Sequence, residues 1–391
     1  DEAFYQESEL IEGANGERLA PTGAPVEWVE EPSFFFRLSD WQQPLLEFYE
    51  RHPDFVLPAS RMNEVKSFVA GGLKDLSISR TSFSWGVPVP GHPGHIMYVW
   101  IDALTNYLSA VDYPDMQSER FRTFWPADLH MVGKDILRFH AVYWPAFLMA
   151  AGIEPPRRVF AHGWWTNEGE KISKSLGNVI DPFALVEEFG VDPVRYFLLR
   201  AVPFGQDGDF SRTAFVERTN ADLANDFGNL AQRVLSMIHK NCEARIPGPG
   251  ALQVGDTALL AQVDEALGEM RSALDRQAFH QAIEALWRRV GKANQYVAEE
   301  QPWVLRKQDP ARMRTVLWSA AEAIRRLAIL AQPFTPDAMT NLLDQLAVPS
   351  HARDFRHLSD PATRLAPGTP IAKPKGVFPR LVLAEDTHEE A

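Results

Sequence analysis

The spacing of apolar residues changes once along this chain, and this change constrains the fold more than any other feature. Between residues 96 and 165, short apolar runs such as IMYVW, DLHMVGKD and RRVFAHGWWT alternate with helical segments. Strand–helix–strand alternation is typical of a parallel α/β sheet, whose ligands gather at the carboxyl ends of the strands. After about residue 214 the apolar period is helical throughout, which predicts a bundle of about four or five helices. We therefore expect an α/β domain followed by an all-α domain.

Three further segments carry local signals. Residues 38–52 and 60–72 have helical periodicity, and the second segment ends at a glycine pair suited to a C-cap. ILRFHAVYWPAFLMAAG, residues 136–152, predicts one helix that ends at Gly152. GVPVPGHPG, residues 86–94, is rich in proline and glycine and predicts a turn without regular structure.

Composition narrows the functional classes. The hydrophobic content of 45% excludes wholesale disorder, and the net charge of −13 argues against indiscriminate nucleic-acid binding while leaving selective RNA binding open. A single cysteine, Cys242, excludes an internal disulfide framework and a cysteine zinc site, and favours a reducing, cytoplasmic setting. No apolar segment is long enough to span a bilayer, and no signal peptide is visible at the start of the chain.

The segment NEGEKISKSLGN, residues 167–178, places two lysines and two hydroxyls in a loop bounded by Gly169 and Gly177. A solvated surface turn is one interpretation. Lysine is also a compact, flexible point charge that can follow a phosphate as it becomes a leaving group, and a bendable loop can close over a bound substrate. The segment is therefore a candidate clamp for a polyphosphate.

Upstream of this loop, aromatic residues recur on helical faces. Trp100, Ala103, Leu104 and Tyr107 fall at i, i+3, i+4 and i+7, a pattern that fits either a buried core or an aromatic-walled pocket for an apolar side chain.

The following strand–helix unit adds three polar or aromatic candidates. Asp135 stands at the strand-to-helix junction, where it could cap the helix or bind a ligand ammonium group. His140 and Trp144 are four residues apart on the same predicted helix. An acid, an imidazole and an indole thus all fall near the carboxyl ends of strands, where ligands of an α/β sheet gather.

The segment KISKS resembles the second signature motif of the class I aminoacyl-tRNA synthetases. YVWIDAL and VGKDILRFHAVYWPAFL narrow the resemblance to the methionyl-tRNA synthetase family, and it extends along nearly the whole chain. It implies a Rossmann-like nucleotide-binding α/β catalytic domain split by a connective insertion, and then a helical anticodon-binding bundle. On this template, residues 1–95 resemble the later part of the insertion, 96–165 the second half of the catalytic domain, 166–220 the signature-loop domain, 221–345 the anticodon bundle and 346–391 a segment that packs back on the body.

The resemblance also implies site residues, position by position. The methionine pocket would comprise Trp100, Ala103, Tyr107, Asp135, His140 and Trp144, with Asp135 receiving the ammonium group. The ATP site would comprise His162, Gly163, Lys171, Ser173 and Lys174, with Arg80 at the rim of the active site. The residues that read the CAU anticodon would be Asn229, Arg233 and Trp303, the last as a stacking platform for a splayed base.

The expected function is therefore a methionine–tRNA ligase that uses methionine, ATP with Mg2+ and tRNA(Met), without zinc or a membrane, as a cytoplasmic monomer. The alternatives are a class I synthetase for leucine, valine or isoleucine, a noncatalytic tRNA-binding module, and a phosphate-binding α/β protein unrelated to tRNA. HPGH at residues 92–95 has the spelling of the family's first signature motif, H-x-G-H, but lies in the proline-rich turn. We interpret it as a coincidence. We expect the true motif to lie upstream, so that the chain alone lacks half of its catalytic domain.

Overall fold

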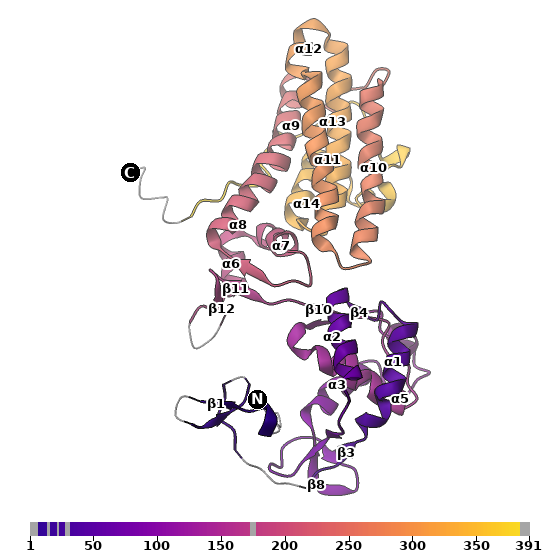
Figure 1. The fold of residues 1–391 in the computed structure, drawn as a ribbon. Coiled ribbons are helices and arrows are strands. Elements are labelled where there is room, and N and C mark those ends of the chain that lie inside the picture. Colours follow the sequence, from indigo (N-terminus) through magenta and orange to yellow (C-terminus); the bar gives the residue numbers. More distant parts are fainter. Residues whose placement is uncertain (1–6, 14–15, 22, 28–31, 173–176, 384–391) are drawn as a thin grey trace. The chain divides into compact units, whose positions relative to one another are not determined.

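The computed structural model describes residues 7–13, 16–21, 23–27, 32–172 and 177–383 (Figure 1). The chain divides into two compact units, unit 1 (Asp1–Ala161) and unit 2 (His162–Ala391). Each unit has apolar clusters of its own, so each is described separately below.

Unit 1 mixes short strands with helices. Its strands are β1 (Ile11–Glu12), β2 (Arg18–Leu19), β3 (Phe35–Phe36), β4 (Val56–Leu57), β5 (Leu76–Ser77), β6 (Ser79–Arg80), β7 (Pro88–Val89), β8 (His92–Met97), β9 (His130–Gly133) and β10 (Val159–His162, whose last residue opens unit 2). Its α-helices are α1 (Gln42–Arg51), α2 (Ala59–Ala70), α3 (Val99–Ser109), α4 (Glu119–Phe124) and α5 (Trp144–Ala150), with the shorter turns η1 (Glu7–Glu9), η2 (Leu38–Trp41), η3 (Lys134–Ile136) and η4 (Phe139–Tyr143).

A three-stranded sheet in the order β4-β10-β9 forms the centre of unit 1. β10 pairs with β4 in parallel, with Val159 opposite Val56, and both side chains are fully buried because helices pack on this sheet. β4 belongs to the region before residue 96, whereas β9 and β10 follow it. Residues between Leu38 and Leu73 therefore share one core with the α/β segment that follows residue 96.

The proline-rich segment 86–94 is not an irregular turn, and this expectation was wrong. β7 and β8 form an antiparallel hairpin in a sheet ordered β6-β8-β7. Pro88 is tolerated because β7 is an edge strand, where a missing N–H breaks no ladder. Gly91 has a φ of 77°, which supplies the left-handed conformation that the tight turn needs.

The segment predicted as one helix over 136–152 is helical up to Ala150, but its regular hydrogen-bond pattern is interrupted within it. A π-helical turn, η4, precedes α5, and the N–H of Trp144 donates to the carbonyl of Phe139, five residues back. Pro145 explains the interruption. It has no N–H for an i→i−4 bond, and its ring would collide with the carbonyl of Ala141 in a regular helix.

Unit 2 begins with a small sheet and continues as helices. Its strands are β11 (Trp165–Asn167), β12 (Glu170–Lys171) and β13 (Gly208–Phe210), in the order β12-β11-β13. Its helices are α6 (Pro182–Phe189), α7 (Val191–Arg200), α8 (Arg212–Thr219), the π-helical η5 (Asn220–Gly228), α9 (Asn229–Asn241), α10 (Val254–Leu274), α11 (Phe279–Glu300), α12 (Pro302–Gln308), α13 (Pro310–Ala331) and α14 (Pro336–Gln345), followed by η6 (Ser350–Ala352), η7 (Phe355–His357) and η8 (Pro361–Thr363).

The helical bundle predicted after residue 214 is present. α10, α11 and α13 run side by side in Figure 1, and their apolar faces share one cluster of buried residues. The chain after α14 returns along the bundle, since Trp318 Nε1 donates to the carbonyl of Leu365 at 3.0 Å and Asn220 bonds the backbone of Leu381 at 2.8 Å. No helix in the described part of the chain has the length and apolar character of a membrane span.

Candidate functional site

α3 and the π-turn η4 bring three of the predicted pocket residues together. The rings of Trp100 and Phe139 stack with centroids 3.8 Å apart and planes 11° apart. Tyr107 Oη lies 2.9 Å from His140 Nε2. Trp144, at the start of α5, has its ring 6.3 Å from that of Tyr107. The helical spacing on α3 and the π-turn η4 thus bring these aromatic side chains into one cluster.

The hydrogen bonds of His140 define its tautomer. Its Nδ1 lies 3.0 Å from the carbonyl oxygen of Ile136, which can only accept, so Nδ1 carries the proton. Neutral His140 must then accept at Nε2, and Tyr107 is the donor. Burial lowers the pKa of His140, although the bond to Ile136 opposes this, so the ring stays neutral near pH 7.

His130, at the start of β9, belongs to the same cluster although it was not among the predicted residues. Its ring lies 4.1 Å from that of Tyr107, and burial, with a smaller contribution from the charge of His140, lowers its pKa to about 4. No sequence pattern assigned a role to this residue. The signal that it faces Tyr107 exists only in the tertiary structure.

Two buried polar atoms of this cluster have no hydrogen-bond partner in the described part of the chain: His130 Nε2 and Trp144 Nε1. His130 is 5% exposed and Trp144 is 3% exposed. An unpaired buried polar group is costly, so such atoms are candidates for contact with a ligand.

The other predicted residues of the methionine pocket lie on more open surfaces. Ala103 is exposed on α3, whereas its neighbour Leu104 is buried in the core. Asp135 is exposed in η3, whose N-cap is Gly133, so Asp135 does not cap this turn.

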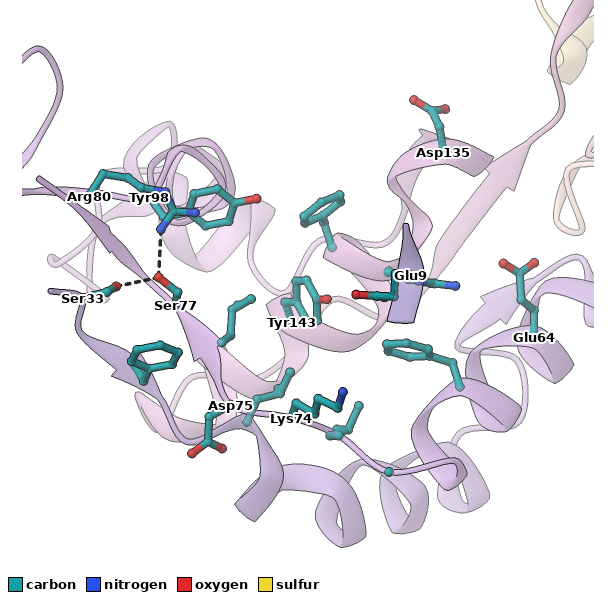
Figure 2. A pocket seen from close by; sticks show the side chains of 18 of the residues that line it. Glu9, Ser33, Glu64, Lys74, Asp75, Ser77, Arg80, Tyr98, Asp135 and Tyr143 are labelled. Carbon is teal, nitrogen blue, oxygen red and sulfur yellow. Dashed lines mark hydrogen bonds between the residues drawn. The ribbon is translucent and has the colours of Figure 1, made fainter. Parts of the chain in front are cut away.

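A cavity of about 860 Å³ in unit 1 is lined by Asp135, Phe139, Tyr143 and Arg80, among others. In the view of Figure 2, Arg80 lies beside Tyr98 and well separated from Asp135. Arg80 is buried, donates to Ser77 Oγ at 2.9 Å and lies 4.4 Å from the centre of the Tyr98 ring. These contacts fix the arginine on the wall of the cavity.

The lysine-rich loop is described only at its base, because Ser173 and Lys174 lie outside the described residues. Lys171 ends β12 and is exposed. Asn178 Nδ2 donates to the carbonyl of Lys171 at 3.0 Å, and Asn167 Nδ2 donates to the carbonyl of Asn178 at 2.9 Å. Gly169 and Gly177 have φ values of 81° and 68°, so both glycines are required by the backbone.

His162 and Gly163 lie at the end of β10. His162 Nδ1 is 2.9 Å from the carbonyl oxygen of Gly163, and its ring lies 6.3 Å from that of Phe204. A Cβ atom at position 163 would lie 2.2 Å from the carbonyl oxygen of Gln206. Close backbone packing therefore explains this glycine without any ligand.

In unit 2, α9 places exposed Asn229 and partly buried Arg233 one turn apart on the same face. Arg233 Nη2 donates to Asn294 Oδ1 at 3.1 Å, and Asn294 Nδ2 donates to Asp226 Oδ1 at 2.6 Å. This chain of bonds joins α9, α11 and η5, and no sequence pattern predicts it. Trp303, on α12, is 46% exposed.

No group of three or more histidine, cysteine or acidic side chains is placed to hold a metal ion within the described ranges.

Comparison with known proteins identifies the family. The model for class I tRNA synthetases (M) matches residues 14–235, and the model for the anticodon-binding domain of methionyl-tRNA ligase matches residues 246–390. The methionine–tRNA ligase of Brucella suis is 58% identical over 99% of this chain and 74% of its own length, and that of Mesorhizobium japonicum is 59% identical over 97% and 73%.

Among solved structures, methionyl-tRNA synthetase of Mycobacterium tuberculosis in complex with methionyl-adenylate is 56% identical, with a TM-score of 0.92 over 97% of this chain and 74% of that chain. The free form of that enzyme gives a TM-score of 0.91 at 54% identity, over 98% of this chain and 76% of that chain. These matches confirm the expected fold class, a class I synthetase catalytic domain followed by a helical anticodon-binding domain. They also exclude a phosphate-binding protein unrelated to tRNA. This chain belongs to the methionyl-tRNA synthetase family, the class I methionine–tRNA ligases.

Proposed function

We propose that the cluster of Trp100, Tyr107, His140 and Trp144 binds the side chain of methionine. The observation that carries this proposal is the Tyr107–His140 hydrogen bond, which holds a neutral imidazole against aromatic walls. A neutral, polarisable lining suits a thioether, since contacts between sulfur and aromatic rings contribute about 0.3–1.5 kcal/mol each. The unpartnered Nε1 of Trp144 supplies a donor for the sulfur, which is a weak acceptor.

Asp135 would receive the ammonium group of the amino acid. Its exposure in η3, at the end of β9, leaves the carboxylate on the surface that an incoming amino acid meets. Arg80, on the wall of the same cavity, adds a fixed positive charge to that surface. In this proposal the cavity binds the charged ammonium group of methionine, and the aromatic cluster binds its apolar side chain.

The family resemblance assigns the phosphate chemistry of the reaction to the lysine loop. A carboxylate oxygen of methionine attacks the α-phosphorus of ATP, which carries Mg2+ on its phosphates, and the bond from that phosphorus to pyrophosphate breaks. Lys171 and Lys174 would stabilise the charge that develops on the departing pyrophosphate, Ser173 would belong to the same phosphate clamp, and His162 and Gly163 would border adenosine. The terminal ribose hydroxyl of tRNA(Met) then attacks the methionyl carbonyl carbon, and AMP leaves.

Recognition of tRNA would rest on Asn229, Arg233 and Trp303. Asn229 and Arg233 present donors from adjacent turns of α9, and the half-exposed indole of Trp303 offers a face on which an unstacked base can lie. The hydrogen bond from Arg233 to Asn294 supports this assignment because it restrains a long side chain on the protein surface.

The test separates binding from chemistry. Methionine affinity is measured by calorimetry and adenylate formation by methionine-dependent pyrophosphate exchange, for the unmodified protein and for Lys174→Ala. We expect Lys174→Ala to slow exchange by a factor of about 100–1,000 with methionine affinity near normal, because the lysine acts on the leaving group. Equal losses of affinity and rate would contradict the clamp. Leucine, valine and isoleucine serve as ligand controls, and binding of any of them as tightly as methionine would contradict the pocket assignment.

A monomeric state and a cytoplasmic location stay predictions. Sedimentation analysis tests the first of them, and fractionation of the source cells tests the second.

A further inference from the structure

Tyr49 and Pro145 meet at one backbone carbonyl, that of Ala141. In a regular helix this carbonyl would accept from the N–H of residue 145, but proline has none. The hydroxyl of Tyr49 donates to the same oxygen at 2.7 Å. A side chain from α1 thus replaces the hydrogen bond that Pro145 removes.

Tyr49 is held firmly enough for this role. It is fully buried, and Phe48 and Phe55 pack on its ring with centroids 6.0 Å away in each case. Burial raises the pKa of its phenol, so the hydroxyl is protonated and can donate at neutral pH. Ala141 is also fully buried, so water cannot substitute for Tyr49 at the carbonyl.

The backbone around this carbonyl is the part of the chain that presents the aromatic cluster. The π-turn η4 spans Phe139–Tyr143, and within it Trp144 N–H bonds the carbonyl of Phe139 in place of the regular i→i−4 pattern. Phe139 stacks on Trp100, and His140 accepts from Tyr107. A return to regular helical hydrogen bonding would rotate these side chains relative to α3, since each hydrogen bond of the π-turn spans one residue more than that of an α-helix. π-turns of this kind occur frequently at functional sites.

We propose that Tyr49 is a positioning residue for the methionine pocket. Together with Pro145, it fixes the π-turn that carries Phe139 and His140. Pro145 excludes the regular helical hydrogen bond at this point because it has no N–H. Tyr49 supplies a hydroxyl donor to the carbonyl of Ala141 in its place. The inference rests on the proposed role of the aromatic cluster in methionine binding. It assigns a function to α1, which lies in the first 95 residues and which the sequence connected only with an insertion.

The experiment uses Tyr49→Phe, Pro145→Ala and Tyr196→Phe in the full chain. Tyr49→Phe removes one hydroxyl and keeps the ring. Pro145→Ala restores an N–H that can bond Ala141 and so permits the regular helix. Tyr196→Phe is the matched control, because it removes another buried phenol hydroxyl, which donates to Asp222 at 2.8 Å in unit 2.

Three quantities are measured for each variant: methionine affinity by calorimetry, melting temperature, and the side-chain nitrogen signals of His140 by NMR, assigned by their loss in His140→Asn. We expect Tyr49→Phe and Pro145→Ala each to weaken methionine binding by about tenfold and to shift the His140 signals. Tyr49→Phe should also lower the melting temperature, whereas Pro145→Ala should leave it unchanged or raise it. Tyr196→Phe should lower only the melting temperature.

Two results would overturn the inference. One is a loss of methionine affinity that is proportional to the loss of melting temperature in all three variants. A tyrosine with a purely structural role would behave in this way. The other is a Pro145→Ala protein with unchanged His140 signals and affinity. If the unmodified chain binds no methionine, the proposed pocket fails, but the His140 signals still decide whether Tyr49 and Pro145 set the position of that ring.

Discussion

The buried His130 predicts a specific loss of stability in acid. The pKa of this imidazole falls from 6.5 to about 4 in the folded protein, mainly through burial and secondarily through the charge of His140. Each tenfold change in proton affinity corresponds to about 1.4 kcal/mol, so the fall corresponds to about 3 kcal/mol. With only 5% of the residue exposed, solvent screens little of this difference.

The direction follows from which state binds more protons. Between pH 6.5 and about 4 the unfolded chain protonates His130 and the folded chain does not. The contribution of neutral His130 to the free energy of unfolding is therefore fully present above about pH 6.5. It is lost as the pH falls from about 6.5 to about 4. The titratable rings packed against His130 are Tyr107 and His140, and the lowered pKa of His140 adds a loss of the same sign.

The assay compares urea unfolding of the unmodified protein and of His130→Phe between pH 4 and 7.5. Phenylalanine keeps a ring beside Tyr107. Any packing cost of the substitution is independent of pH, so this cost does not affect the slope of the free energy of unfolding against pH. We expect the unmodified protein to lose about 3 kcal/mol more than His130→Phe across this range. Equal slopes for the two proteins, or an NMR titration of His130 with a midpoint near 6.5, would refute the burial argument.

Two further predictions concern unit 2. Asn294→Ala should weaken binding of an anticodon stem-loop of tRNA(Met) by about five- to tenfold, because Arg233 loses the acceptor that restrains it. Asn241→Ala serves as the control in a filter-binding assay, and equal affinities of the two variants would contradict the restraint. Gly163→Ala should destabilise the protein by more than about 2 kcal/mol in urea unfolding, because its Cβ would overlap the carbonyl oxygen of Gln206. An unchanged unfolding midpoint would show that the backbone at Gln206 yields freely.

The sequence was most informative where local periodicity decides the structure. The period change near residue 214 predicted the bundle correctly because α10 and α11 each bury one apolar face, while α13 is buried on all sides from Thr315 to Ala331. It was least informative about prolines. Pro88 is compatible with a strand because β7 is an edge, and Pro145 changes the helix type without ending the helix. Both outcomes depend on neighbours far away in the sequence.

Some residues of the candidate site could be identified from the sequence, and others only from the structure. Helical spacing placed Trp100 and Tyr107 on one face of α3, whereas the hydrogen bond between Tyr107 and His140 is seen only in the structure. His130 and Asn294 could not be identified from the sequence, since each is connected to the site only through a contact between elements. A short motif identifies the residues that meet a ligand more readily than the residues that hold them in place.

The protonation of the aromatic cluster determines what it can recognise. Neutral His140 uses its one proton on the carbonyl of Ile136, and Tyr107 uses its proton on His140, so neither ring has a hydrogen left to donate to a ligand. Trp144 Nε1–H is then a buried donor without a partner in the described part of the chain. A thioether sulfur can accept from it, whereas the side chains of leucine, valine and isoleucine offer no acceptor. Shape alone distinguishes apolar side chains by only about 1–3 kcal/mol per methylene, so in the proposed pocket the Trp144 donor and the sulfur–ring contacts would supply the chemical preference for methionine.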